Sequence, residues 1–345
     1  MKSLYLVLNL RLFDEANLNV NTTATDTLSA ENKTYYQKKL IGLARKKLVH
    51  GRFLDKYSIP KNGGKTTEFR KYSKLPKVTT ALQEGVTPKG QKMEVTAIIA
   101  EVSQYGGYVT LSDMLEMSAI DPNISVATEL CGYQSGESID GITREILNAG
   151  TNVLYAPKVA ADGTETEVTD RASLDKTAQI TVDVVNTAVA YLKAQDTEPI
   201  GEANAYMGLI HPYAAYDLRK DPMWIDVNKY AGAEKIFDGE IGKIGGVRFI
   251  EASEVKIWKD ETCPEGLGVF STIIMGLHAG AETEIEGLGM EHIVKQKGSG
   301  GTSDPLNQRS TVGWKATHTA EILSEEYMIR IESCSARFSE KVEAN

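Results

Sequence analysis

One uninterrupted helical pattern constrains the fold of this chain more than any other feature. It begins at Asp121 and Pro122, where proline occupies the first helical position, and stops at Asn148-Ala149-Gly150. Its apolar residues keep helical phase along one stripe: Ile124, Ala127, Cys131, Ile139, Ile142, Ile146 and Ala149. At 1.5 Å per residue the helix would run about 40 Å, which is long for a compact enzyme domain. We therefore expect a helical spine in an extended architecture.

Two strand-like runs, Thr66–Tyr72 and Met93–Tyr105, enclose a polar segment that contains Gly85, Pro88 and Gly90. This pattern predicts a long β-hairpin with an exposed tip. A two-stranded hairpin is only marginally stable alone, so it needs a surface to lie on. That surface could belong to another subunit.

The remaining segments predict a mixed α+β fold. The first 28 residues are rich in Asn and Thr, which favours an extended arm, and a basic amphipathic helix is expected from Ser29 to the residue before Gly51. A helix should follow Thr181, a short one should end at Arg219, and Gly298–Pro305 should be a flexible loop. The expected strands are Ala205–Ile210, Val247–Glu251 and Val269–Met275, with Trp314–Leu323 and Tyr327–Ser333 as a second hairpin.

Charge is distributed unevenly along the 345 residues. The formal net charge is −9, but residues 1–90 hold 17 basic and 7 acidic side chains and carry +10, so the remaining residues carry −19. The basic segment could be solvated surface, an arm that binds nucleic acid, or an arm that lies across an acidic neighbouring copy. Short clusters at Arg45-Lys46-Lys47 and Arg70-Lys71 do not decide between these interpretations.

Motifs for chemistry are missing. Gly298–Gly301 lacks the Gly-Lys-Ser/Thr ending of a phosphate-binding loop, and Gly132–Gly136 lies inside the predicted long helix rather than at a nucleophile elbow. His211 and Asp217 have no third partner to orient the imidazole. The five histidines show no zinc-ligand spacing, and Cys131, Cys263 and Cys334 are expected to be reduced structural thiols. We predict no catalytic residue, no cofactor and no metal site.

Two further features, an acidic run and an apolar run, bear on possible binding or targeting. Glu282, Glu284 and Glu286 alternate and could attract a divalent cation, although a solvated or interface face is favoured for carboxylates without convergent partners. The apolar run Ser3–Leu10 is short and is not followed by a cleavage pattern, so no signal peptide is expected. Because no stretch approaches about 20 apolar residues, no membrane association is expected, and the protein should stay in the cytosol where it is made.

Several blocks of residues, in order between Lys33 and Ile331, are more specific than the patterns above, because each is a run of several residues that can be compared with a known family. They are Pro60–Thr66 with Glu68-Phe69-Arg70, Glu84–Pro88 with Gly90-Gln91, Tyr105–Val109 with Leu111–Met114, Arg144–Asn152, Glu234–Phe237 with Gly239–Gly242, and Asp304–Arg309 with Val312–Lys315. Together they resemble the major capsid proteins of tailed bacteriophages, in the branch typified by the coliphage N-four coat. Residues 1–31 depart from this pattern, residues 160–176 look variable in length, and no segment resembles a fused scaffolding domain.

The resemblance implies the Hong Kong 97 type capsid fold, in which many copies tile an icosahedral shell as hexamers and pentamers. On that basis we expect an N-terminal arm at 1–58, an extended β-hairpin loop at 59–110, a peripheral domain with the spine helix at 111–175 and an axial domain at 176–290. Residues 291–345 would form strands that return to the peripheral domain.

The resemblance also implies function and partners. The expected protein is a non-enzymatic major capsid (coat) protein that self-assembles in the bacterial cytoplasm into the virion shell enclosing double-stranded DNA. A portal protein is an expected partner. Whether a scaffolding or decoration protein also takes part is left open by the sequence. The basic arm and hairpin would lie across acidic neighbours, while the acidic remainder would confine DNA without sequence-specific binding. The candidate interface residues are Arg45, Lys46, Lys47, Arg70, Lys71, Glu84 and Lys89.

The sequence leaves two alternatives open. The same fold could form an encapsulin-like compartment that stores an enzyme cargo, because fold alone does not fix function. A cytosolic enzyme with an unrecognised site is the other, although no convergent constellation of residues supports it.

Overall fold

The computed structural model describes residues 20–21, 49–118, 123–201, 204–225 and 240–345. These residues form two compact units. Of the described residues, the first unit contains 20–21 and those within 104–135 and 290–316, and the second contains 49–103 and those within 136–289 and 317–345. The long helix α3 (Asn123–Asn148) and the long strand β16 (Arg309–Ile322) each contribute residues to both units.

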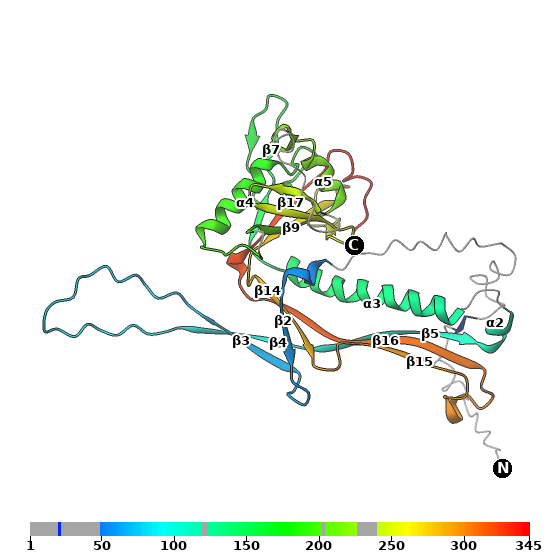
Figure 1. Cartoon of the computed structure of the whole chain (residues 1–345). Coiled ribbons are helices and arrows are strands. Elements are labelled where there is room, and N and C mark those ends of the chain that lie inside the picture. The colour runs from blue at the N-terminus through cyan, green and yellow to red at the C-terminus, as the bar shows by residue number, and fades with distance from the viewer. Residues whose placement is uncertain (1–19, 22–48, 119–122, 202–203, 226–239) are drawn as a thin grey trace, which may run out of the picture. The chain divides into compact units, whose positions relative to one another are not determined.

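In the first unit, β16 lies between β5 (Ser103–Ser112) and β15 (Met290–Lys295), and β1 (Val20–Asn21) pairs with β5 (Figure 1). The helix α2 (Asp113–Ser118) follows β5, and the 3-10 turn η4 (Gly301–Ser303) precedes β16. The first half of α3 packs on one face of this sheet. Trp314 Nε1 donates to Gln134 Oε1 at 3.0 Å, and the Ser135 hydroxyl lies 3.4 Å from Met290 Sδ. The first unit therefore consists of a helix packed on one face of a sheet.

The second unit is built around a seven-stranded sheet with strand order β10-β11-β9-β13-β17-β6, and β12 pairs with β13. The strands are β6 (Val153–Tyr155), β9 (Tyr206–Ile210), β10 (Glu240–Ile244), β11 (Val247–Glu251), β12 (Ile257–Trp258), β13 (Val269–Met275) and β17 (Met328–Ser333). Alternate residues enter different cores: Ile210 and Phe249 pack with α4 (Val182–Ala194) and α5 (Pro212–Leu218), whereas Leu209 and Ile250 pack with Leu147 of α3. The sheet is therefore buried on both faces, as its continuous apolar strands require.

Local chemistry starts the two helices that cover this sheet. The Thr181 hydroxyl caps α4 by accepting the Val184 N–H at 3.4 Å, and His211 Nδ1 caps α5 by accepting the Tyr213 N–H at 3.2 Å. Pro212 then occupies the first turn of α5. These helices and the strands β9, β11 and β13 confirm the elements predicted from the apolar periodicity.

Smaller elements complete the second unit. β2 (Asp55–Ile59) pairs in parallel with β14 (Gly280–Ile285), which pairs antiparallel with the second half of β16. β3 (Thr66–Tyr72) and β4 (Val95–Glu101) form a separate two-stranded hairpin, and β7 (Lys158–Val159) pairs with β8 (Glu165–Thr166). Single 3-10 turns are η2 (His50–Phe53), η3 (Arg171–Ser173) and η5 (Glu325–Tyr327).

Two sequence-based expectations on strands need correction. The run Met93–Tyr105 is not one strand, because β4 ends at Glu101 and β5 starts at Ser103 in a different sheet. The predicted C-terminal hairpin is wrong: β16 and β17 flank a short turn but lie in separate sheets, where β17 pairs with β13 and β6. The turn residues before β17 predicted that the chain reverses into a hairpin. The partners of β17 are determined instead by the burial of both faces of this strand.

The long helix is confirmed, but the face that it buries in its second half differs from the predicted apolar stripe. Ile139, Ile142 and Ile146 are only half-buried, whereas the polar residues on the adjacent stripe are buried: Asp140, Thr143, Arg144 and Asn148. Each of these has a hydrogen-bond partner, as buried polar groups require. Polar contacts, together with the buried Leu147, therefore hold this half of α3 in its unit.

A buried ion-pair cluster ties the end of α3 to the sheet. The Glu332 carboxylate is fully buried and accepts two hydrogen bonds from Arg171, at 2.6 and 2.7 Å, and one from Arg330 at 2.9 Å. Arg330 Nη1 also donates to the carbonyl of Gly150 at 2.8 Å, and Arg171 stacks 3.9 Å over the ring of Trp258. These contacts compensate the burial of charge.

Candidate assembly interface

The hairpin of β3 and β4 has two unlike faces. On the face turned toward its own unit, Phe69 makes an edge-to-face contact with Tyr57 at 4.9 Å, and Lys71 Nζ lies 3.1 Å from Glu326 Oε2. The opposite face, which we call the outer face, carries Tyr72, Val95 and Ile99, which are 58%, 49% and 66% exposed. Exposed apolar side chains gathered on one face mark a surface that contacts another macromolecule.

The neighbouring candidates Arg70 and Lys71 lie on opposite faces of the hairpin, because side chains alternate along a strand. Arg70 is exposed on the outer face, where its Nε donates to Glu68 Oε1 at 2.8 Å. This hydrogen bond and the charge of Glu68 raise the pKa of the Arg70 guanidinium. Of the two, only Arg70 is therefore placed to meet a partner through the outer face.

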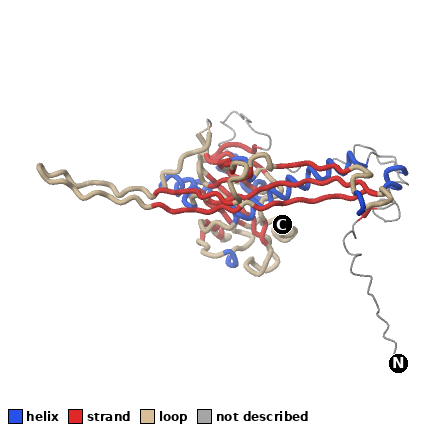
Figure 2. The backbone as a smooth tube through the Cα atoms, turned by 90° about the horizontal axis from the view of Figure 1, so that it is seen from below, coloured by secondary structure: helices blue, strands red, loops and turns tan. Residues whose placement is uncertain are grey.

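Residues 73–94 connect the two strands without regular secondary structure and are exposed throughout (Figures 1 and 2). Glu84 and Lys89 lie in this segment, and a turn joins the Val86 N–H to the Gln83 carbonyl at 3.2 Å. Its apolar side chains are strongly exposed: Leu75, Val78, Leu82, Val86 and Met93. A connection that exposes this much apolar surface needs a partner to cover it.

The three remaining candidates, Arg45, Lys46 and Lys47, lie outside the described residues. The same holds for the predicted N-terminal arm up to Leu48, apart from the two residues of β1, and for the predicted basic helix up to Leu48. Directly after Leu48, where the described residues resume, the chain is anchored to α3. Asp140 of α3 accepts hydrogen bonds from the backbone N–H groups of Val49 and His50 and from the His50 ring. Sequence reasoning missed Asp140, because a lone aspartate inside a helix carries no signal of a distant backbone partner.

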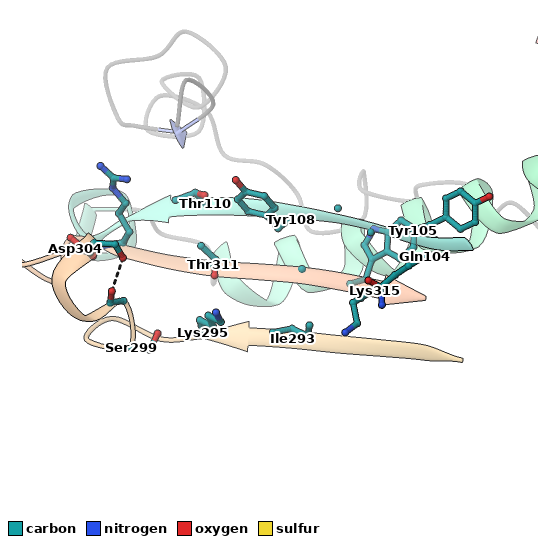
Figure 3. Close-up of a pocket in the computed structure, with 17 residues that line it drawn as sticks. Gln104, Tyr105, Tyr108, Thr110, Ile293, Lys295, Ser299, Asp304, Thr311 and Lys315 are labelled. Carbon is teal, nitrogen blue, oxygen red and sulfur yellow. Dashed lines mark hydrogen bonds between the residues drawn. The ribbon is translucent and has the colours of Figure 1, made fainter. Parts of the chain in front are cut away.

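The first unit carries a hollow of about 710 Å³ over its three long strands. Figure 3 shows Tyr108 and Thr110 from β5, Thr311 and Lys315 from β16, and Ile293 and Lys295 from β15 around it. Glycines on adjacent strands keep the strands close: a Cβ on Gly106 would lie 2.7 Å from the Trp314 carbonyl oxygen, and one on Gly313 would lie 2.9 Å from that of Gly107. The hollow offers polar, basic and aromatic groups on a rigid sheet.

The residues weighed for chemistry serve structural contacts. His211 caps α5, and burial lowers the pKa of its imidazole to about 4. Asp217 is buried in α5, and burial raises the pKa of its carboxyl. Glu284 and Glu286 are exposed, but Glu282 is half-buried and lies 3.3 Å from the Thr143 hydroxyl, so it is not part of a solvated face. Burial raises the pKa of the Glu282 carboxyl.

The described residues also bear on metal binding and on membrane insertion. Within the described ranges, no group of three His, Cys, Asp or Glu side chains could hold a metal ion. In the same part of the chain, no helix is both long and apolar enough to cross a membrane. The three cysteines are buried and unpaired by disulfides, and burial raises the pKa of the Cys334 thiol to about 12.

Comparison with known proteins identifies the class. Residues 110–267 match the model of a family described as phage capsid protein. The capsid of the cyanophage P-SCSP1u superposes with a TM-score of 0.64 at 13% identity, covering 92% of this chain and 97% of that chain. The capsid of Ralstonia phage GP4 gives 0.64 at 14% identity, covering 96% and 98%. No curated protein matches the sequence.

The predicted α+β fold of the Hong Kong 97 type is therefore confirmed. The family match bears on function as well as on fold. It confirms the prediction of a phage capsid protein, which is a structural protein and not an enzyme. The fold alone is also found in the holo-SrpI encapsulin complex from Synechococcus elongatus PCC 7942, with a TM-score of 0.55 at 11% identity, covering 93% of this chain and 99% of that chain. Of these comparisons, the family match is the one that favours the phage class.

Proposed function

We propose that this chain is the major subunit of an icosahedral phage shell, in which copies arranged as hexamers and pentamers enclose double-stranded DNA. The observation that carries the proposal is the β3–β4 hairpin, whose outer face and connecting segment expose apolar and basic side chains. A second copy of this acidic chain is a complementary partner for that surface.

The finer assignments belong to the same proposal. Residues 1–58 would be the arm, 59–110 the extended loop, 111–175 and 291–345 the peripheral domain, and 176–290 the axial domain. The sequence blocks named above support the coliphage N-four branch. The shell would assemble in the bacterial cytoplasm around a portal protein, and the excess of acidic residues after position 90 would limit its affinity for the enclosed DNA.

Expression of the chain with its neighbouring phage genes tests the role directly. Sedimentation velocity and negative-stain microscopy should show closed shells or ring-shaped capsomers, because hairpin contacts link one copy to the next. A stable monomer under these conditions would refute the proposal. Shells that contain an enzyme instead of DNA would point to an encapsulin-like compartment.

Two variants test whether the outer face of the hairpin makes the contact between subunits. Arg70→Glu and Ile99→Asp change exposed residues of the outer face, so each should reduce shell yield by about tenfold while leaving the thermal midpoint of the subunit unchanged. Ala161→Asp is the matched control for Ile99→Asp, because it adds the same single negative charge to an exposed turn outside the hairpin. Normal shell yield from both hairpin variants would show that the outer face is not an interface.

A further inference from the structure

Two lysines at the end of the β3–β4 ladder, where the connecting segment begins, join the hairpin to the body of its own unit. Lys71 Nζ lies 3.1 Å from Glu326 Oε2 and 5.7 Å from the centre of the Tyr327 ring. Lys74 lies two residues after the end of β3, and its Nζ lies 2.6 Å from Asp196 Oδ2. The same contact raises the pKa of the Lys74 ammonium and lowers that of the Asp196 carboxyl.

The two carboxylates are presented by turns at the ends of rigid elements. Glu326 lies in η5, between β16 and β17, and Asp196 follows the end of α4 with a left-handed φ of 56°. Both acceptors are therefore fixed by the second unit, while both donors belong to the hairpin. A pair of contacts at different points on one rigid body restricts the direction of the hairpin as well as its position.

The contacts are few and solvated, so they can be released. The side chains of Lys71 and Glu326 are 37% and 54% exposed, and those of Lys74 and Asp196 are 77% and 76% exposed. Exposed ion pairs contribute little each and weaken as salt screens them. Beside them lies a hollow of about 330 Å³, lined by Tyr57, Phe69, Ile98 and Leu323, so this part of the hairpin does not pack tightly on the body.

We propose that Lys71 and Lys74 form a salt-sensitive latch that seats the hairpin on its own subunit in one direction. A seated hairpin presents Arg70, Tyr72 and Ile99 in a fixed direction before any partner arrives, which reduces the ordering that a contact requires. The two lysines then act within one subunit and are not part of the contact between subunits. The latch is a property of the single chain and does not depend on the proposed shell.

Distance measurements by pulsed electron resonance test the latch. Spin labels at Val95→Cys, at the end of the hairpin ladder beside the two lysines, and at Ala161→Cys, on an exposed turn of the body, report where this end of the hairpin lies. The three native cysteines are buried and should not compete for the label. Dilution of the labelled protein into an excess of unlabelled protein keeps the measured distances within one chain, whether or not the chains assemble.

The latch predicts a narrow distance distribution at low salt that becomes about twofold wider in 1 M NaCl, because the Debye length falls to about 3 Å. The double variant Lys71→Gln, Lys74→Gln should be equally wide at low salt. Lys89→Gln, Lys92→Gln removes the same charge from the exposed connecting segment and should keep the narrow distribution. A Lys71/Lys74 variant that stays narrow, or a wild type that is already wide at low salt, would overturn the proposal.

Discussion

The Asp140 carboxylate on α3 clasps His50, accepting the backbone N–H at 2.9 Å with one oxygen and the ring Nδ1–H at 2.7 Å with the other. The backbone N–H of Val49 is a third donor, at 3.1 Å from the first oxygen. His50 is fully buried, and Asp140 is nearly so. One side chain on the long helix thus fixes the point at which the chain enters β2 and, after it, the hairpin.

Replacing Asp140 tests this clasp. Asp140→Ala would leave three buried donors without an acceptor, so the free energy of unfolding of the unassembled subunit should fall by about 3 kcal/mol. Asp140→Asn keeps one acceptor oxygen and should cost less. Urea unfolding followed by circular dichroism measures both, and an alanine variant as stable as wild type would show that the clasp does not hold the segment.

His211 makes stability dependent on pH. Its imidazole is buried against Phe270, with ring centres 5.1 Å apart, and its pKa is about 4 in the folded chain, against about 6.5 when unfolded. Because the unfolded state binds the proton more tightly, this stability is complete above pH 6.5 and is lost as the pH falls toward 4. The loss attributable to His211 should reach about 3 kcal/mol.

His211→Asn keeps a capping side chain but removes the titration, so unfolding measured between pH 6.5 and 4 should become less dependent on pH. His292→Asn is the matched control, because His292 is exposed on β15 and should leave the pH dependence unchanged. If the free energy of unfolding of wild type and of His211→Asn changed with pH in the same way, His211 would not be the source of the pH dependence. His318, whose pKa is also lowered by burial, should leave a residual slope of the same sign.

Two glycines of the first unit should respond oppositely to alanine. A Cβ on Gly106 would meet the Trp314 carbonyl oxygen at 2.7 Å, and backbone cannot move aside as a side chain can, so Gly106→Ala should destabilise by roughly 1–3 kcal/mol. Gly132 lies within α3 with open space around the Cβ position, so Gly132→Ala should stabilise by about 1 kcal/mol. Calorimetry compares their melting temperatures, and equal shifts for both variants would argue against close packing of β5 on β16.

Elements specified by local periodicity could be predicted from the sequence. The apolar runs of β9, β11 and β13 and the uninterrupted pattern of α3 needed no knowledge of distant segments. The partners of β17 could not be predicted, because Ser324–Glu326 resembles a hairpin turn while pairing is determined by burial against β13 and β6.

The buried face of α3 was mispredicted for a related reason. Counting apolar residues favours Ile139, Ile142 and Ile146, whereas Asp140 and Thr143 are buried because distant segments supply their hydrogen-bond partners. Within the candidate interface, the basic character of the hairpin was visible in the sequence. The separation of Arg70 from Lys71 follows from strand alternation, but the acceptors of Lys71 and Lys74 lie more than 100 residues away along the chain.

A cryo-EM reconstruction of particles purified after co-expression with the phage neighbours tests the central claim most directly. The account predicts a closed icosahedral shell in which the outer face of the hairpin, at Arg70, Tyr72 and Ile99, is covered by a second copy of the chain. Particles in which this face is open to solvent, or a preparation that contains only monomers, would contradict it.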